Sequence, residues 1–354
     1  MPVFPAEGPV TLHVQFPAGD LDIAATRRED AVVEVRPANP SRSADVRFAE
    51  KTHVEYVNGT IHIEAPERPL SLGRDPRLKI LIGLPERSRV EFATSSANAR
   101  MTGPLGDVSV RTSSGDTRVS HCAAFDVNTS SGDVTCDVIE GDARLKSSSG
   151  DIELGEVYGT ATVGLASGTL DLGMVGGAAG VKTSSGNVRI GQADGSVEVK
   201  STSARVTIET ISAGDVSVTS SSGNVRIGRA SGSVQVTSTS AGVTIETMTA
   251  GDVSVTSSSG NVRIGRASGS VQVKSTSAGV TIDSITAGVA SVTSDSGNVR
   301  VGVAEGTSAW LDVSSTSGKV ASSLEQADKP DDGERAEIHV QTGSGSVAIT
   351  RAHA

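Results

Sequence analysis

The chain has 354 residues, a formal net charge of −10, 40 glycines and an aromatic content of only 2 %. So few large side chains would fill a globular core poorly, whereas a narrow interior of Val, Ile, Ala and Ser suits this composition. The acidic balance argues against general binding to nucleic acid or to anionic membranes.

The N-terminal region shows no targeting or membrane-spanning signal. The first 16 residues, MPVFPAEGPVTLHVQF, lack a basic start and a long apolar stretch, so they do not resemble a secretory signal. The longest apolar run, residues 78–84, is too short to span a bilayer. The sequence therefore predicts a cytoplasmic protein without an integral membrane segment.

Residues 1–93 contain short runs of alternating apolar and polar residues, which are typical of β-strands with one buried face. Asn58 and Gly59 predict a tight hairpin turn, and residues 66–77 have the composition of a loop. We expect this region to form irregular first coils and a cap. The alternating runs lie at residues 10–16, 18–23, 32–37, 45–57 and 60–63.

Residues 94–180 repeat turns of the type Ser-Ser-Gly-Asp. Asp116, Asp133 and Asp151 recur at one position of this turn, and later copies carry Asn there. A column of carboxylates could bind calcium, but the glycine-rich nonapeptides of calcium-binding β-rolls are absent. Gly followed by Asp or Asn is ordinary turn chemistry. We favour the structural turn and keep calcium as the alternative.

The strongest signal is a 37-residue unit that occurs at residues 215–251 and again at residues 252–288, with four differences. Within it, Ser-Gly and Ser-Ala turns recur every 17 to 19 residues, and the series extends from residue 97 to residue 297. The pattern V-x-V-x-S-x-S-G-x-V-x-I predicts two short strands around each turn. A fixed period of this kind indicates a solenoid.

Alignment of the copies places aliphatic residues in columns that a solenoid would turn inward. β-branched side chains suit such columns, in which successive coils lie roughly 4.8 Å apart. The three columns are Val188, Val206, Val225, Val243, Val262, Val280 and Val299; Ile190, Ile208, Ile227, Ile245, Ile264, Ile282 and Val301; and Val199, Val218, Val236, Val255, Val273 and Val292.

The outward positions carry arginines on every second coil, with acidic residues diagonal to them. This arrangement suits either a charged binding stripe or a solvated face whose charges set the register of the coils, and we favour the second. The residues are Arg189, Arg226, Arg263 and Arg300, with Glu209, Glu246 and Asp283.

The two cysteines occupy different places in the repeat. Cys136 falls in the aliphatic column between Val119 and Leu154, whereas Cys122 is expected in a turn. Unmatched positions argue against a disulfide, so both are expected to be reduced thiols. A cation site formed by His121, Cys122 and Cys136 is the less favoured alternative.

An acidic segment, residues 325–337, interrupts the pattern before residues 338–349 restore it. The last coil is expected to end almost at the C-terminus, which would leave its strand edge uncovered beside Arg351. The acidic segment is an alternative cover for that edge. Trp310 is expected to be a packing or cap residue and not a ligand platform.

Three segments resemble a known family: AGDLDIAATRREDAVVEVRPANP (residues 18–40), ADVRFAEKTHVEYVNGTIHIEAP (44–66) and AWLDVSSTSGKV (309–320), with Ser-Ser-Gly-Asp-Val turns between them. They resemble the actinobacterial β-strand-repeat family of unknown function labelled "putative adhesin", or Toastrack. The resemblance implies a right-handed β-solenoid with a surface or scaffold role and no catalytic residues. Members of that family are often membrane-tethered or exported.

The expected fold is therefore all-β, a single right-handed β-solenoid (β-helix) with about 18 residues per coil. Residues 1–93 would form the irregular N-terminal coils and cap. Residues 94–354 would form the regular solenoid, interrupted by the acidic loop.

The expected function is that of a non-enzymatic structural or interaction protein, whose elongated surface serves partner binding or self-association. We predict no catalytic, cofactor-binding or metal-binding residues and no small-molecule substrate. One alternative is a polysaccharide-acting parallel β-helix enzyme, which would need clustered carboxylates, whereas these are spread singly. Another is an ice-binding or crystal-surface-binding protein that uses the small hydroxyls of residues 201–203, 237–239 and 275–277.

Overall fold

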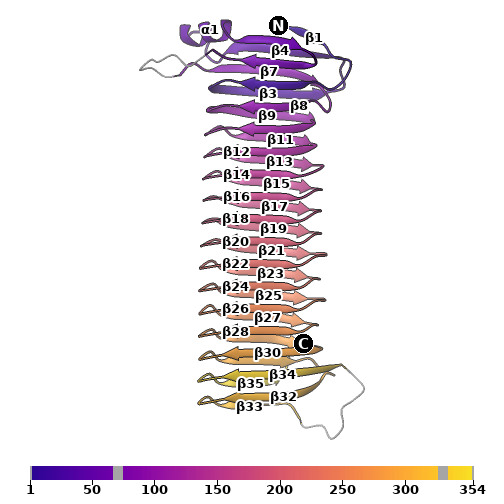
Figure 1. The fold of residues 1–354 in the computed structure, drawn as a ribbon, viewed down its shortest axis with the longest axis vertical. Helices are drawn as coiled ribbons and strands as arrows, with labels where there is room; N and C mark the ends of the chain where they lie inside the picture. Colours follow the sequence, from indigo (N-terminus) through magenta and orange to yellow (C-terminus); the bar gives the residue numbers. More distant parts are fainter. Residues whose placement is uncertain (1, 67–74, 326–333, 353–354) are drawn as a thin grey trace. The chain divides into compact units, whose positions relative to one another are not determined.

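The computed structural model describes residues 2–66, 75–325 and 334–352, which belong to two compact units, Met1–Gly176 and Gly177–Ala354. In each unit the chain alternates between two long, mainly parallel sheets, here called sheet A and sheet B (Figure 1). This arrangement confirms the predicted all-β solenoid. The predicted division at residues 93/94 stays a prediction, and most of the loop at 66–77 and of the acidic segment lies outside the described residues.

Unit 1 holds the strands β1 to β17 and the helix α1 (Ser43–Glu50). Its sheet A contains β1 (Val3–Pro5), β3 (Ala18–Thr26), β4 (Asp30–Pro37), β7 (Leu78–Pro85), β9 (Ser96–Pro104), β11 (Thr117–Cys122), β13 (Val134–Ile139), β15 (Ile152–Val157) and β17 (Leu170–Val175). Its sheet B contains β2 (Thr11–Gln15), β5 (His53–Val57), β6 (Thr60–Glu64), β8 (Arg89–Ala93), β10 (Asp107–Arg111), β12 (Ala124–Thr129), β14 (Ala143–Ser147) and β16 (Ala161–Leu165).

Unit 2 holds the strands β18 to β35. Its sheet A contains β19 (Asn187–Ala193), β21 (Arg205–Ile211), β23 (Val225–Ala230), β25 (Val243–Met248), β27 (Val262–Ala267), β29 (Val280–Ile285), β31 (Val299–Val303), β33 (Val320–Ser322) and β35 (Val347–Arg351). Its sheet B contains β18 (Ala179–Thr183), β20 (Val197–Ser201), β22 (Val216–Ser220), β24 (Val234–Ser238), β26 (Val253–Ser257), β28 (Val271–Ser275), β30 (Gly288–Ser294), β32 (Ser308–Ser315) and β34 (Arg335–Thr342).

The predicted aliphatic columns form the interior of unit 2. Ile227 is 0 % exposed and pairs in register with Ile208 on one side and Ile245 on the other. The neighbouring position, Arg226, is exposed on the outer face. Strict alternation of inward and outward side chains follows from the pleat of the strands, so the assignment of both faces is confirmed.

The 37-residue unit consists of two coils of unequal length. Val206 pairs with Val225 and Val225 pairs with Val243, so successive coils contain 19 and 18 residues. At Gly223 the coils approach so closely that a Cβ would lie 1.6 Å from the carbonyl oxygen of Ala204. Only glycine permits this approach without a shift of the backbone.

The N-terminal end of unit 1 departs from the order of the chain. β2 pairs with β6 on one side and β8 on the other, and β3 lies likewise between β7 and β9. β1, β4 and β7 pair antiparallel, as do β5 and β6, which are joined by a turn at Asn58 (φ 49°) and Gly59 (φ 80°). This part is the predicted irregular region, and its hairpin turn is confirmed.

One predicted strand is a helix. Residues 45–50 were expected to continue a strand toward the hairpin, but Ser43–Glu50 forms α1. A spacing of three residues places Asp45 and Phe48 on the same face of this helix, and both are buried. The Asp45 carboxylate accepts hydrogen bonds from the backbone amides of Asn39 (3.2 Å) and Arg77 (3.2 Å), which hold α1 in place. The alternation of apolar and polar residues in this segment therefore does not form a strand, and the segment folds as a helix.

The C-terminal end of unit 2 also departs from chain order. β34 pairs with β30 and β32, and β35 pairs with β31 and β33. The last strands in the sequence are thus enclosed between two earlier coils. The expectation that the last coil leaves an uncovered edge is wrong, because the terminal coil of this unit is formed by β32 and β33.

Candidate functional site

The turn aspartates and asparagines form a hydrogen-bonded ladder between coils. One Oδ1 of Asp116 accepts a bond from the backbone amide of Asp133 (3.1 Å), and Asp133 accepts one from Asp151 in the same way (3.0 Å). Asn224 and Asn261 do the same for the glycines that open the next coils (3.2 and 3.1 Å). These contacts support the structural interpretation of the Ser-Ser-Gly-Asp turns over the calcium alternative.

The hydroxyl groups proposed for ice binding are in part turned inward. Ser238 is 5 % exposed, and its Oγ accepts a bond from the backbone amide of Ala241 (2.8 Å). Ser201 and Ser275 accept the corresponding bonds from the backbone amides of Ala204 and Ala278. Because one hydroxyl of each triplet bonds to the backbone of the turn, the hydroxyl groups do not form the continuous flat surface that ice binding would need.

Three arginines of unit 2 are paired with acids of the adjacent coil. Arg189 contacts Glu209 (2.8 Å), Arg263 contacts Asp283 (2.9 Å), and Arg226 forms an ion pair with Glu246. All of these side chains are largely exposed, so each pair contributes about 0–1 kcal/mol. The diagonal pairing agrees with the prediction and supports a role in register.

A groove of about 820 Å³ runs over this charged face. Its polar lining includes Arg205, Arg226, Arg263, Glu209 and Glu246. Positive and negative side chains alternate along the groove, and Glu209 and Glu246 already form ion pairs with arginines. This face therefore lacks the uniform charge that would attract ligands of the opposite sign.

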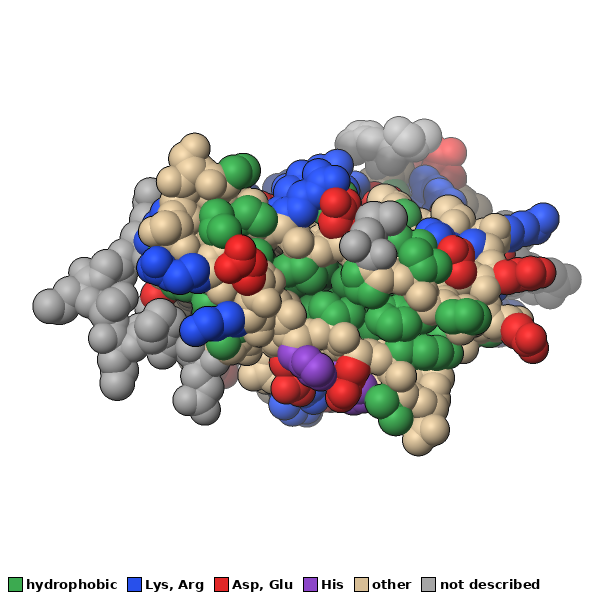
Figure 2. All heavy atoms as spheres, turned by 90° about the horizontal axis from the view of Figure 1, so that it is seen from above, with side chains coloured by type: hydrophobic (Ala, Val, Ile, Leu, Met, Phe, Trp, Pro, Cys, Tyr) green, Lys and Arg blue, Asp and Glu red, His purple; other side chains and the backbone are tan. Residues whose placement is uncertain are grey.

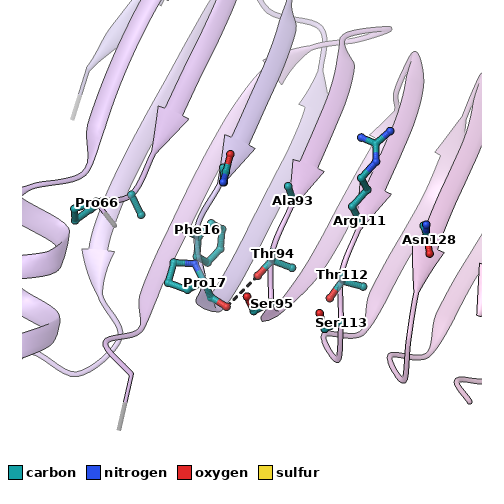
Figure 3. Close-up of a pocket in the computed structure, with 12 residues that line it drawn as sticks. Phe16, Pro17, Pro66, Ala93, Thr94, Ser95, Arg111, Thr112, Ser113 and Asn128 are labelled. Atoms are coloured by element: carbon teal, nitrogen blue, oxygen red, sulfur yellow. Dashed lines mark hydrogen bonds between the residues drawn. The ribbon is translucent and has the colours of Figure 1, made fainter. Parts of the chain in front are cut away.

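A second hollow of about 520 Å³ lies beside the turns of unit 1 (Figure 3). Phe16 and Pro17 form one part of its lining, and Phe16 packs against Phe92 with ring centroids 5.6 Å apart. The hydroxyl of Thr94 donates to the carbonyl oxygen of Pro17 (3.3 Å). Arg111 is the one ionisable side chain among its lining residues, so this hollow holds no acid–base pair for hydrolysis.

The two cysteines meet inside unit 1. Cys136 pairs in register with Val119 and Leu154, as predicted. Cys122 was expected in a turn, but it ends β11 and is 0 % exposed. Cys122 pairs in register with Ile139, which is also 0 % exposed, so it belongs to a further inward column of sheet A.

Both thiols are free, with their sulfur atoms 3.8 Å apart. The contact with Cys136 and, next, burial raise the pKa of the Cys122 thiol, so it stays protonated. His121 does not join the thiols, because its Nε2 contacts Glu140 (2.8 Å). Arg87, followed by His121, lowers the pKa of Glu140. In the described part of the chain, no three His, Cys, Asp or Glu side chains converge on a metal position.

The terminal coil of unit 2 differs from the coils beneath it. Leu311 and Val313 of β32 are partly exposed, whereas Ile338 and Val340, their partners on β34, are 0 % and 2 % exposed. Among the described strands, β32 pairs only with β34 and β33 only with β35. This coil therefore presents unpaired main-chain groups beside apolar side chains.

Trp310 lies on this same coil and is 57 % exposed. Its ring meets His339 edge-on at 5.2 Å, in a hollow of about 1050 Å³ that Leu311 and Leu324 also line. The residue is at the terminal coil, as a cap residue would be, but it is not packed in the interior. A large exposed aromatic beside an open edge is typical of association surfaces.

The fold and these surfaces define a β-solenoid of short coils with hydrogen-bonded turns. The chain belongs to the Toastrack DUF4097 family, whose model matches residues 11–196 and again residues 191–353. This confirms the resemblance seen in the sequence. The function of this family is unknown.

No curated protein matches the sequence significantly. The chain is similar to a solved structure titled "putative cell adhesion protein" from Clostridium sporogenes, over 99 % of this chain and 98 % of that one. The sequence identity is 8 % and the TM-score is 0.20, so this similarity carries no argument about function.

Of the helical residues described, none forms a segment long and apolar enough to cross a membrane. The cytoplasmic location stays a prediction.

Proposed function

We propose that this protein is a non-enzymatic structural module that associates with a second copy of itself through the coil formed by β32 and β33. The observation that carries this proposal is the open terminal coil of unit 2. Its inward residues Leu311 and Val313 are partly exposed, and Val320 on β33 is 50 % exposed. In a solenoid the surface that covers such a coil is another coil.

A second copy offers the same open coil. A two-fold axis would place β32 antiparallel to β32 of the other copy, which allows main-chain hydrogen bonds along both edges. In a register centred on Leu311, that side chain contacts its own counterpart, and Ala309 lies opposite Val313 of the partner subunit. The inward residues thus meet apolar residues. On the outer face, Trp310 lies opposite Asp312 of the partner subunit, so no like charges are opposed.

A non-enzymatic role is supported by how the ionisable groups are used. The turn carboxylates accept backbone hydrogen bonds, and three arginines of unit 2 pair with acids. Glycan hydrolysis needs two carboxyl groups free to act on one bond, at a defined separation. Among the described residues, the hollow beside Phe16 has no carboxylate in its lining, and the two carboxylates of the charged groove, Glu209 and Glu246, are ion-paired with arginines.

The test is sedimentation velocity of the full chain over a wide concentration range, together with Leu311→Lys. We expect a reversible dimer for the natural chain and a dissociation constant increased roughly tenfold or more for Leu311→Lys, because the lysine would be desolvated at the contact. Ser314→Lys is the matched control, since this residue lies on the same strand but points outward. It should dimerise nearly as the natural chain does.

A natural chain that remains monomeric at all concentrations would overturn the proposal, as would equal behaviour of the two lysine variants. A third variant replaces residues 326–333, which lie outside the described residues, with a glycine-serine linker of the same length. If only this variant dimerises, the acidic segment covers the edge and the native coil is not open.

A further inference from the structure

Three of the six histidines of the chain lie on the outer face of sheet B in unit 1, although the sequence scatters them. The strand order β5, β6, β2, β8 brings four outward residues into one column. Glu55 lies opposite His62, His62 lies beside His13, and His13 lies beside Glu91. The result is a carboxylate, two imidazoles and a second carboxylate on four adjacent strands.

Figure 2 looks onto the N-terminal end of unit 1 and shows histidine and acidic side chains side by side at one margin of it. The rings of His13 and His62 are stacked, with centroids 5.1 Å apart and planes inclined by 12°. A hollow of about 270 Å³ adjoins them, and Glu64, Glu91 and Arg111 also line it. Both rings are therefore open to a small solute.

The contact between His13 and Glu91 determines which ring nitrogen can act as a ligand. The Nδ1 of His13 lies 3.0 Å from Oε2 of Glu91, and this contact favours the tautomer with the proton on Nδ1. The Nε2 then keeps its lone pair and is free to bind a cation. A histidine that donates its second N–H to a carboxylate is the usual arrangement around protein-bound metals.

Imidazole nitrogens on neighbouring strands suit Zn²⁺, Ni²⁺ and Cu²⁺, which prefer such ligands over carbonyl oxygens alone. The rings are partly exposed, so rotation about their side-chain bonds can direct both Nε2 atoms to one ion. Since no third His, Cys, Asp or Glu converges with them among the described residues, the remaining positions of the ion would be filled by water.

We propose that His13 and His62 bind one divalent transition-metal ion on the outer face of unit 1, through their Nε2 atoms. Glu91 is a positioning residue, because it acts through His13 and does not touch the ion. This site shares no residue with the self-association proposal. It is built from β2, β6 and β8, whereas the open coil is built from β32 and β33. The two proposals therefore fail or succeed separately.

The test is calorimetric titration of the full chain, without an affinity tag, with ZnCl₂ and NiCl₂. We expect one saturable site that is lost in His13→Ala and in His62→Ala. Glu91→Ala should weaken binding roughly 10- to 100-fold, as removal of such a supporting carboxylate does, and Glu91→Asp should restore part of the loss. In NMR spectra the ring signals of His13 and His62 should shift on addition of Zn²⁺.

His53→Ala is the matched control, because His53 lies in the same patch and contacts Glu55 (3.2 Å) but is outside the column. It should bind metal as the natural chain does. Absence of saturable binding to the natural chain would overturn the proposal, as would a loss in His53→Ala equal to that in His13→Ala. Thermal melts of all variants show whether each retains the fold, and a variant that melts early is replaced by the corresponding glutamine.

Discussion

The inward columns should resist charge far more strongly than the outward ones, and Ile227→Asp tests this most directly. Ile227 is 0 % exposed, with Ile208 and Ile245 as its neighbours in the column and no polar partner for a carboxylate. Truncation of such a side chain alone costs about 2–5 kcal/mol. An unpartnered polar group adds roughly 1–3 kcal/mol, so we expect a loss of about 3–8 kcal/mol of stability.

The assay is urea unfolding followed by circular dichroism, with Arg226→Ala as the neighbouring outward control. That change removes one exposed ion pair with Glu246, and its expected cost is at most about 1 kcal/mol. Equal losses for the two variants would refute the assignment of inward and outward faces.

The pH dependence of Ile227→Asp gives a second check on its magnitude. A buried carboxyl group titrates at higher pH in the folded state than in the unfolded state, because burial disfavours the charged form. The folded state then binds more protons, so the deficit relative to Ile227→Asn should grow as the pH rises above about 4 and shrink below it. A deficit that does not change with pH would mean that the residue reaches water.

Two further predictions concern close packing. Gly223→Ala should destabilise unit 2 by about 1–3 kcal/mol or more, since its Cβ would lie 1.6 Å from the Ala204 carbonyl oxygen. Gly242→Ala should cost less, because its Cβ would lie 3.2 Å from the Asn224 side chain. Thermal melts that rank the two variants in the opposite order would contradict the observed coil spacing. The Cys122 thiol should not react with a thiol reagent at neutral pH until the protein is unfolded, because the contact with Cys136 and burial raise its pKa. Mass spectrometry that finds it modified in the folded chain would show that unit 1 opens there.

The interior of the coils could be predicted from the sequence because each column depends on a local rule. Alternation sets the inward face, and a constant period aligns Ile208, Ile227 and Ile245. The Arg263–Asp283 pair follows from the same register. Where the period is constant, residues one period apart in the sequence are neighbours on adjacent strands.

The ends could not be predicted, because strand order there no longer follows chain order. His13 and His62 are 49 positions apart in the sequence, yet they lie on adjacent strands because β2 is placed between β6 and β8. For the same reason the open coil is formed by β32 and β33 and not by the last strands of the chain. At α1 the apolar residues Val46 and Phe48 alternate as in a strand, whereas the structure buries Asp45 and Phe48 on one face of a helix.

The enclosure of β34 and β35 has a consequence for the order of assembly. A solenoid wound in the order of synthesis would add each coil to the one just finished. Here the strands made last settle against β30 and β31, and those made earlier, β32 and β33, form the outermost layer. Winding of unit 2 therefore cannot be completed while the ribosome still holds residues 335–351, and once it is complete the C-terminal strands cannot peel away without breaking hydrogen bonds on both flanks.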